Sequence, residues 1–224
     1  MTVPQRRRLA AAFAAAGITL GAAACSSSTG STTGGGGALS YDRVRSTALD
    51  LVKNKSTSCP FGLDLAKAAS GAGIAGAVAP APADGRSVRG DAGDGVPATN
   101  GQPATPPHAQ ITCSYTVGPS TVVDIDLLAV PQNDYAVSMM LPSIQAAGLL
   151  SVDQLSRFST DRPAVGQTRI TPDKGTAAVA RVAVKGEGDL VLMLSQDFRD
   201  SDPDPALTGE PLRKAAEALA AQLH

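Results

Sequence analysis

Apolar residues recur at helical spacing in two stretches of the chain. After Ser40, which suits a helix N-cap, the apolar positions predict a helix over residues 41–53. Pro60 suits the first turn of a second, short helix. After Pro211 a single apolar stripe predicts the last helix, and its members are Leu212, Ala215, Ala216, Leu219 and Leu223.

Alternation of apolar and polar residues predicts a β-hairpin in the middle of the chain. Its strands are residues 111–117 and 121–130, joined by a Gly-Pro-Ser turn at 118–120. The apolar positions are Ile111, Cys113, Tyr115 and Val117 in the first strand and Val123, Ile125, Leu127 and Ala129 in the second. Asp124 and Asp126 point the other way, so we expect an antiparallel sheet with one wet face.

A second hairpin follows, with strands at residues 176–185 and 189–196 around a Gly-Glu-Gly turn. Between the hairpins we expect a helix capped by Asn133 and kinked or broken at Pro142. A capping box at residues 151–154 predicts a further short helix.

In outline the order of elements is α-α-β-β-α-β-β-α. Paired strands combined with helices predict an α+β domain, with an antiparallel sheet built from two hairpins and helices packed on one face. We place this single domain at residues 40–224, a length in the usual range for one domain.

Residues 70–110 break the pattern, because they are rich in Gly, Ala and Pro and hold few large apolar side chains. Such a segment buries too little to offset its conformational entropy, so we predict a disordered insertion there. A G-x-G-x-x-G match at residues 71–76 follows a helix instead of a strand, and we therefore expect no dinucleotide or other cofactor.

The N-terminus has the layout of a secretory signal. Three arginines at residues 6–8 precede an uncharged, Ala-rich run to residue 24, which predicts a signal peptide over residues 1–24. The three alanines at 22–24 fit an ordinary signal-peptidase site. Followed by Cys25, they also resemble the bacterial lipoprotein box, in which the thiol receives a diacylglyceryl group and becomes the new N-terminus.

The composition after Cys25 favours lipidation. Residues 25–39 form a flexible Ser/Thr/Gly tether, which would span roughly 20 Å and hold a domain off a membrane. The alternative is a disordered tail on a freely secreted protein.

Two further cysteines, Cys59 and Cys113, remain if Cys25 carries a lipid. Outside the cytoplasm such a pair usually forms a disulfide, and closing this loop would contribute about 4 kcal/mol in the chain-entropy model. Free thiols and a metal site that adds His108 are alternatives. The metal site lacks a fourth nearby soft ligand and a tight C-x-x-C spacing.

Charge and aromatic content exclude several partners. The formal charge is −1, and removal of the three arginines of the signal makes it −4. We expect no nucleic-acid partner and no polybasic contact with lipid headgroups. With no Trp and three Tyr, the chain also lacks the composition of an aromatic sugar-binding platform.

The sequence offers few catalytic groups. His108 falls in the predicted insertion and His224 is the last residue, so neither suits a rigid general base. Asp124 and Asp126 share a strand face and could meet a ligand or cation, although a solvated hairpin face is the simpler interpretation. The acidic stretch at residues 197–204 lacks the Gly and terminal Glu of a calcium loop.

Several short motifs together resemble the small lipoproteins of the actinobacterial cell envelope, which include families of unknown function. They are the Ala-Ala-Ala-Cys at residues 22–25, the tether, the Ser-Cys-Pro at 58–60, the Thr-Cys-Ser-Tyr at 112–115, the hairpin at 184–194 and the terminal Ala/Leu helix. The resemblance implies an extracytoplasmic, membrane-tethered α+β domain, and it implies no catalytic residues.

The leading hypothesis is therefore a lipid-anchored module at the outer face of the cell membrane that binds without catalysis. Its partner would be an envelope protein, a peptide or an apolar ligand. The alternatives are a secreted envelope-modifying hydrolase that uses Asp124 and Asp126, and a carrier of an apolar small molecule. Without lipid on Cys25 the protein would be secreted.

Overall fold

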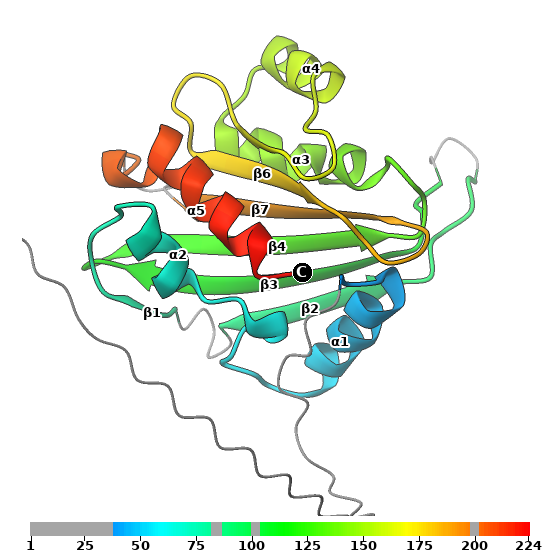
Figure 1. Cartoon of the computed structure of the whole chain (residues 1–224). Coiled ribbons are helices and arrows are strands. Elements are labelled where there is room, and N and C mark those ends of the chain that lie inside the picture. The colour runs from blue at the N-terminus through cyan, green and yellow to red at the C-terminus, as the bar shows by residue number, and fades with distance from the viewer. Residues whose placement is uncertain (1–37, 82–86, 100–103, 198–201) are drawn as a thin grey trace, which may run out of the picture. The chain divides into compact units, whose positions relative to one another are not determined.

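One antiparallel sheet forms the centre of the domain (Figure 1). The computed structural model describes residues 38–81, 87–99, 104–197 and 202–224. The strands are β1 (Val78–Pro80), β2 (Val88–Gly93), β3 (His108–Val117), β4 (Thr121–Val130), β5 (Thr168–Ile170), β6 (Ala177–Val182) and β7 (Asp189–Asp197). Their order is β1-β3-β4-β7-β6-β5, with β2 also paired to β3.

The helices are α1 (Tyr41–Lys53), α2 (Leu65–Gly71), α3 (Ala136–Gly148), α4 (Val152–Thr160) and α5 (Gly209–Ala221), with short 3-10 turns η1 (Pro60–Gly62) and η2 (Pro205–Leu207). The β3–β4 and β6–β7 pairs are the two predicted hairpins. The α+β class and both hairpins are thus confirmed.

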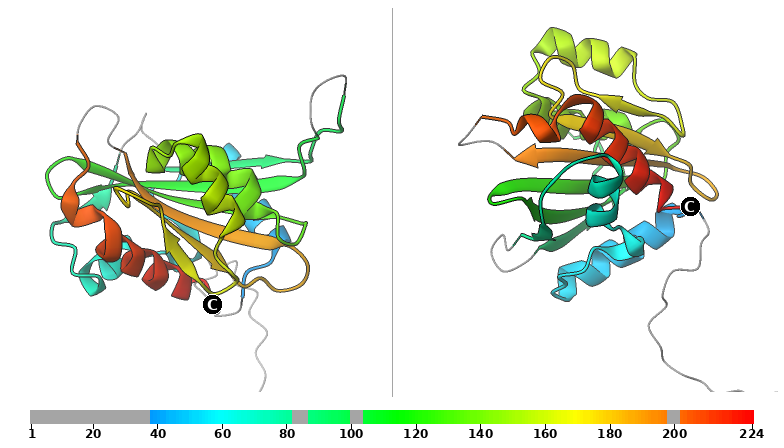
Figure 2. Two further views of the ribbon diagram at one scale, coloured as in Figure 1. Left: turned by 90° about the horizontal axis from the view of Figure 1, so that it is seen from above. Right: turned by 60° about the vertical axis from the view of Figure 1, so that its left-hand side comes forward.

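Helices cover both faces of the sheet, so the prediction that they pack on one face is wrong. On the first face α1, α2 and α5 bury the alternate positions Ile111, Ile125, Leu127, Leu192 and Leu194. On the second face α3 and α4 bury Leu128, Val130, Val179, Val191 and Met193. Figure 2 shows the two helix groups on opposite sides of the strands. Because both faces are covered, β6 is buried at every position and β7 at every position except the last.

The prediction of disorder across residues 70–110 is wrong for the described part of that segment. β1 and β2 pair one after the other with the same edge of β3, and Val96 and Thr105 form a further bridge beyond them. The resulting β2–β3 hairpin extends past the neighbouring strands (Figure 2). Few side chains of this segment are buried besides those of Val88 and Ala81. Its stability therefore comes mainly from backbone hydrogen bonds to β3.

The predicted disulfide is confirmed. Cys59 and Cys113 are joined across a sequence separation of 54 residues. Cys113 pairs in register with Val88 of β2, and Ser56 bridges to the same Val88. The disulfide therefore fixes the segment before α2 to the sheet where the edge strand attaches. The alternatives of free thiols and of a metal bound by these sulfurs are excluded.

Two local predictions made from the sequence are also confirmed. The predicted helix at residues 41–53 is α1, with the Ser40 side chain as its N-cap. The capping box between Ser151 and Gln154 is present at the start of α4. The folded part begins slightly before residue 40, because Leu39, assigned to the tether, is buried and accepts a hydrogen bond from Lys185 N at 2.8 Å.

Helix α3 differs from its prediction at Asn133, and it is not broken at Pro142. It continues across Pro142 to Gly148, because the flanking Met140 and Ile144 are buried against the sheet. Asn133 does not cap it. Instead, the side chain of Asp189 accepts a hydrogen bond from the Ala136 amide at 2.9 Å.

Candidate functional site

A pocket of about 660 Å³ lies on the second face of the sheet, beside the C-terminal half of α3. It is lined by Asp124, Asp126, Ser143, Ala146, Ala147, Leu149, Lys174, Met193, Ser195, Gln196, Asp197, Asp202 and Pro203. Its volume lies in the range of small-molecule sites, and its walls combine apolar and charged groups.

A change of polarity along β4 creates the pocket. The positions of β4 that face α3 are apolar at Leu128 and Val130 but acidic at Asp124 and Asp126. Over the apolar end, α3 presents Val137 and Met140, which fill the space. Over the acidic end it presents the small residues Ser143, Ala146 and Ala147, which leave the space open.

Two side chains hold the walls in place. Gln196 is buried, accepts a hydrogen bond from Asp204 N at 2.8 Å and donates to Leu207 O at 3.0 Å, so it fixes the segment that carries Asp202 and Pro203. The Thr176 hydroxyl donates to Ala147 O at 2.6 Å and ties the start of β6 to α3.

Asp126 is the most unusual group of the pocket, because it is only 9% exposed. Its Oδ1 accepts hydrogen bonds from Thr112 Oγ1 at 2.5 Å and from Gln110 Nε2 at 3.3 Å. Its Oδ2 accepts none from the part of the chain that the structure describes. Burial raises the pKa of this carboxyl, the Thr112 hydrogen bond opposes that rise, and the charge of Asp124 adds to it.

Leu149 is the second unusual residue. It follows the last turn of α3 with φ 49° and ψ 40°, the left-handed conformation in which Gly is the usual residue. Its side chain is 57% exposed although it is large and apolar, and it lines the pocket. A strained backbone therefore presents an apolar side chain to the open space.

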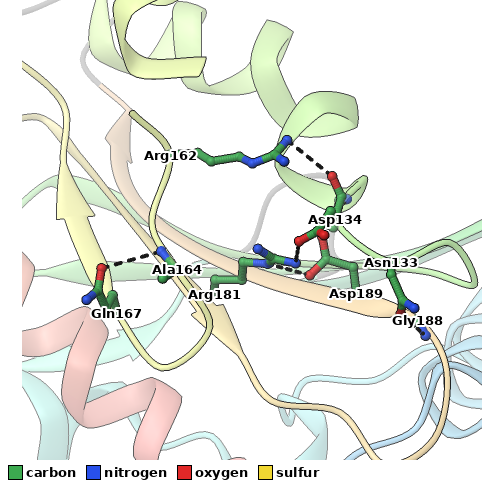
Figure 3. A network of polar contacts seen from close by, with 9 residues as sticks. Asn133, Asp134, Arg162, Ala164, Gln167, Arg181, Gly188 and Asp189 are labelled. Carbon is green, nitrogen blue, oxygen red and sulfur yellow. Dashed lines mark hydrogen bonds and ion pairs between the residues drawn. The ribbon is translucent and has the colours of Figure 1, made fainter. Parts of the chain in front are cut away.

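A buried ionic network fixes the opposite end of α3 (Figure 3). Arg181 donates from Nε to Asp189 Oδ1 at 2.7 Å and from Nη2 to Asp134. Arg162 reaches the Asp134 carbonyl, and Asn133 accepts from Gly188 N. The buried charges of this network are paired with each other, so its role is to position α3.

The residues singled out in the sequence are distributed as follows. Cys25 and the signal peptide lie outside the described residues. His108 lies in β3 with its Nε2 3.5 Å from Asp91, so its placement in a disordered insertion is wrong. Asp124 and Asp126 do share a face, but burial of Asp126 under α3 overturns the interpretation of a solvated surface.

Within the described ranges, no group of three or more His, Cys, Asp or Glu side chains is placed to hold a metal ion. None of the described helices is both long and apolar enough to cross a membrane.

Sequence reasoning missed Leu149, Ser143 and the alanines of α3. Only Leu149 had a sequence signal. It directly follows Gly148, and glycine is common at helix ends, where the chain often adopts the left-handed conformation. In comparisons with known proteins, no family model, curated protein or solved structure matches this chain.

Proposed function

We propose that this chain is an extracytoplasmic lipoprotein, anchored through Cys25, that binds a small amphipathic molecule without chemically changing it. The ligand occupies the pocket between β4, β7 and α3. The sequence supports the anchor, and the pocket supports the choice of a small molecule over a flat protein partner.

The observation that carries the proposal is that two costly features meet in one pocket. Burial of the Asp126 carboxylate and the left-handed backbone of Leu149 both lower stability. Stable domains retain such features mainly where a ligand uses them. An apolar side chain at one place and a carboxylate at another also suit an amphipathic molecule.

The first experiment is mass spectrometry of the full protein from a membrane fraction. Denaturing spectra should show a chain that begins at Cys25 and carries acyl groups, with the other two cysteines protected from alkylation until reduction. Native spectra of the same sample should show an additional small-molecule adduct. A chain beginning at Cys25 without acyl groups would contradict the anchor.

Ala146→Trp tests where the adduct binds. Ala146 lines the pocket and is exposed, so an indole fills the space without disturbing the core. We expect the adduct to disappear in this variant. Ser156→Trp on the exposed side of α4 is the matched control and should retain it. An adduct that persists in Ala146→Trp would overturn the assignment of the pocket.

A hydrolase is the second candidate, because Asp124 and Asp126 line one pocket and the charge of Asp124 helps to raise the pKa of Asp126. Such a pair suits a general acid beside an ionised carboxylate. The double variant Asp124→Asn/Asp126→Asn should then abolish an envelope-linked hydrolytic activity. Unchanged hydrolysis of cell-wall and lipid substrates in that variant would eliminate this candidate.

A further inference from the structure

We propose that the end of the β2–β3 hairpin touches the lipid surface beside the anchor, and that this contact sets the orientation of the domain on the membrane. The described part of this hairpin beyond the paired strands β2 and β3, residues 94–99 and 104–107, is called the arm. The inference rests on the proposed anchor at Cys25 and goes beyond it, because it assigns a second, non-covalent contact.

The arm lies at the end of the sheet where the described chain begins. The ladder registers place the root of the arm at Gly93 beside the end of β4 and the beginning of β7. The turn before β7 contains Lys185, whose amide donates to Leu39 O at 2.8 Å. Figure 1 shows the start of α1, the β6–β7 turn and the arm at this same end.

The chain between the proposed anchor and the domain is short. Cys25 precedes Leu39 by 14 residues, and a Ser/Thr/Gly segment of this length spans roughly 20 Å. A lipid on Cys25 would therefore keep this end of the domain close to the bilayer. Even a weak contact would then form, because the effective concentration of the lipid surface is high.

The tip of the arm presents an uncharged and partly apolar surface. Val96 is 61% exposed, and Pro97 and Ala98 beside it are also exposed. Residues 95–99 and 104–107 carry no charged side chain, and the preceding Asp94 is paired with Arg45 of α1. A lipid surface can therefore receive the tip without desolvating an unpaired charge.

Tyr135 adds an interfacial side chain to the same surface. It is 40% exposed, and together with Val96 and Pro97 it lines a pocket of about 460 Å³ between the arm and the start of α3. Tyrosine has an apolar ring and a polar hydroxyl, so it is favoured at a membrane–water interface. The ion pair between Asp134 and Arg181 fixes the residue before Tyr135, which holds the ring beside the arm.

Backbone hydrogen bonds fix the position of Val96. Its amide donates to Thr105 O at 2.7 Å, and the Thr105 amide donates to Val96 O at 2.9 Å. The other described side chains of the tip are small. The arm therefore lacks the large side chains on which protein interfaces depend, and this favours a lipid surface over a protein partner.

The test uses the full mature protein reconstituted in phosphatidylcholine vesicles. Because the chain contains no Trp, a single Trp reports on its own surroundings. Tyr135→Trp places this probe beside the arm, and Ser120→Trp places it in the exposed turn between β3 and β4 at the other end of the sheet. We expect Tyr135→Trp to lose fluorescence intensity when phosphatidylcholine with brominated acyl chains replaces the ordinary lipid. Ser120→Trp should keep its intensity.

Val96→Asp in the Tyr135→Trp chain should restore most of the lost intensity, because a charge at the tip opposes contact with lipid. Val52→Asp in the same chain is the matched control. It also replaces an exposed valine, which is 53% exposed near the end of α1, and it should leave the quenching unchanged.

The possible failures are distinguishable. The arm inference is wrong, while the anchor stands, if the acylated protein stays on the vesicles and neither Trp is quenched. Equal quenching of both Trp probes, or quenching that survives Val96→Asp, contradicts it in the same way. If the protein carries no acyl groups and does not remain on the vesicles, the proposed anchor fails together with the inference.

Discussion

Arg181 Nε lies 2.7 Å from Asp189 Oδ1, and the two residues belong to neighbouring strands of the same hairpin. Both side chains are nearly inaccessible to solvent. The other carboxylate oxygen of Asp189 accepts from the first amide of α3. One buried carboxylate therefore joins the β6–β7 hairpin to the helix that forms a wall of the pocket.

Asp189→Ala should destabilise the protein by about 3–5 kcal/mol, because it leaves Arg181 buried with only the exposed Asp134 as partner and leaves the Ala136 amide unpaired. Urea denaturation measures the loss. Asp161→Ala breaks an exposed pair with Arg169, which solvent screens, and should cost much less. Equal losses in the two variants would show that burial of the network is unimportant.

Gly90→Ala should destabilise the protein by roughly 2 kcal/mol or more, because α1 packs directly on β2 at this position. A Cβ atom on Gly90 would lie 2.2 Å from the Ala48 carbonyl oxygen, so the helix must shift. Gly71→Ala is the control, since its Cβ would meet nothing within 4 Å. Urea midpoints that fall equally for both variants would contradict this steric explanation.

Asp126→Asn should stabilise the protein at neutral pH. Folding raises the pKa of this carboxyl, mainly through burial, so its contribution to stability is full at acidic pH and is lost as pH rises through the raised pKa. The amide cannot ionise and escapes this loss. We expect the Tm difference from wild type to be small near about pH 4 and to reach at least about 2 °C near about pH 7.5.

The measurement is a series of thermal unfolding curves across that pH range. Asp50→Asn, which removes an exposed carboxylate from α1, serves as the control, and its Tm difference should not grow with pH. A constant difference for Asp126→Asn would mean that this carboxyl titrates alike in the folded and unfolded chain.

Leu149→Gly should raise stability by about 1 kcal/mol, because Gly adopts the left-handed conformation without a Cβ clash and the exposed Leu side chain contributes little packing. The same change should reduce the small-molecule adduct in native mass spectra. Leu149→Ala keeps the backbone strain but loses the side chain, so it should weaken binding without stabilising. An unchanged adduct in both variants would remove Leu149 from the ligand site.

Replacement of Cys59 and Cys113 by Ser should cost about 4 kcal/mol in the chain-entropy model. The loss should be greatest at the edge of the sheet, where Val88 and Ser56 meet beside the disulfide. Hydrogen exchange should therefore accelerate in β2 before it does in β7. Uniform acceleration across the sheet would contradict a local role for the disulfide.

Elements with strong local signals could be predicted from the sequence. Ser40 marked the start of α1, the Ser151–Gln154 box marked α4, and alternation marked β3 and β4. In each case the determining contacts lie within a few residues of each other, so a short window of sequence contains them.

Elements that depend on distant partners could not be predicted in this way. β2 exists because β3 offers it a ladder of hydrogen bonds, and few of its own side chains are buried. Coverage of the second face did have a signal, since the run from Leu190 to Leu194 is apolar on both faces, which is typical of a strand buried on both sides.

The candidate site was predictable only in part. The shared face of Asp124 and Asp126 follows from alternation. Their enclosure depends on where Ser143 and Ala146 of α3 come to lie and on the hydrogen bonds of Gln196, which no local pattern encodes.

The hydrogen bond between Leu39 and Lys185 fixes where the start of the described chain joins the sheet. Lys185 lies in the turn that precedes Asp189, whereas the pocket surrounds Ser195 toward the other end of β7, about 20 Å farther along the strand. Whatever acts on the domain through the chain before Leu39 therefore meets it at the end of β7 remote from the pocket lining.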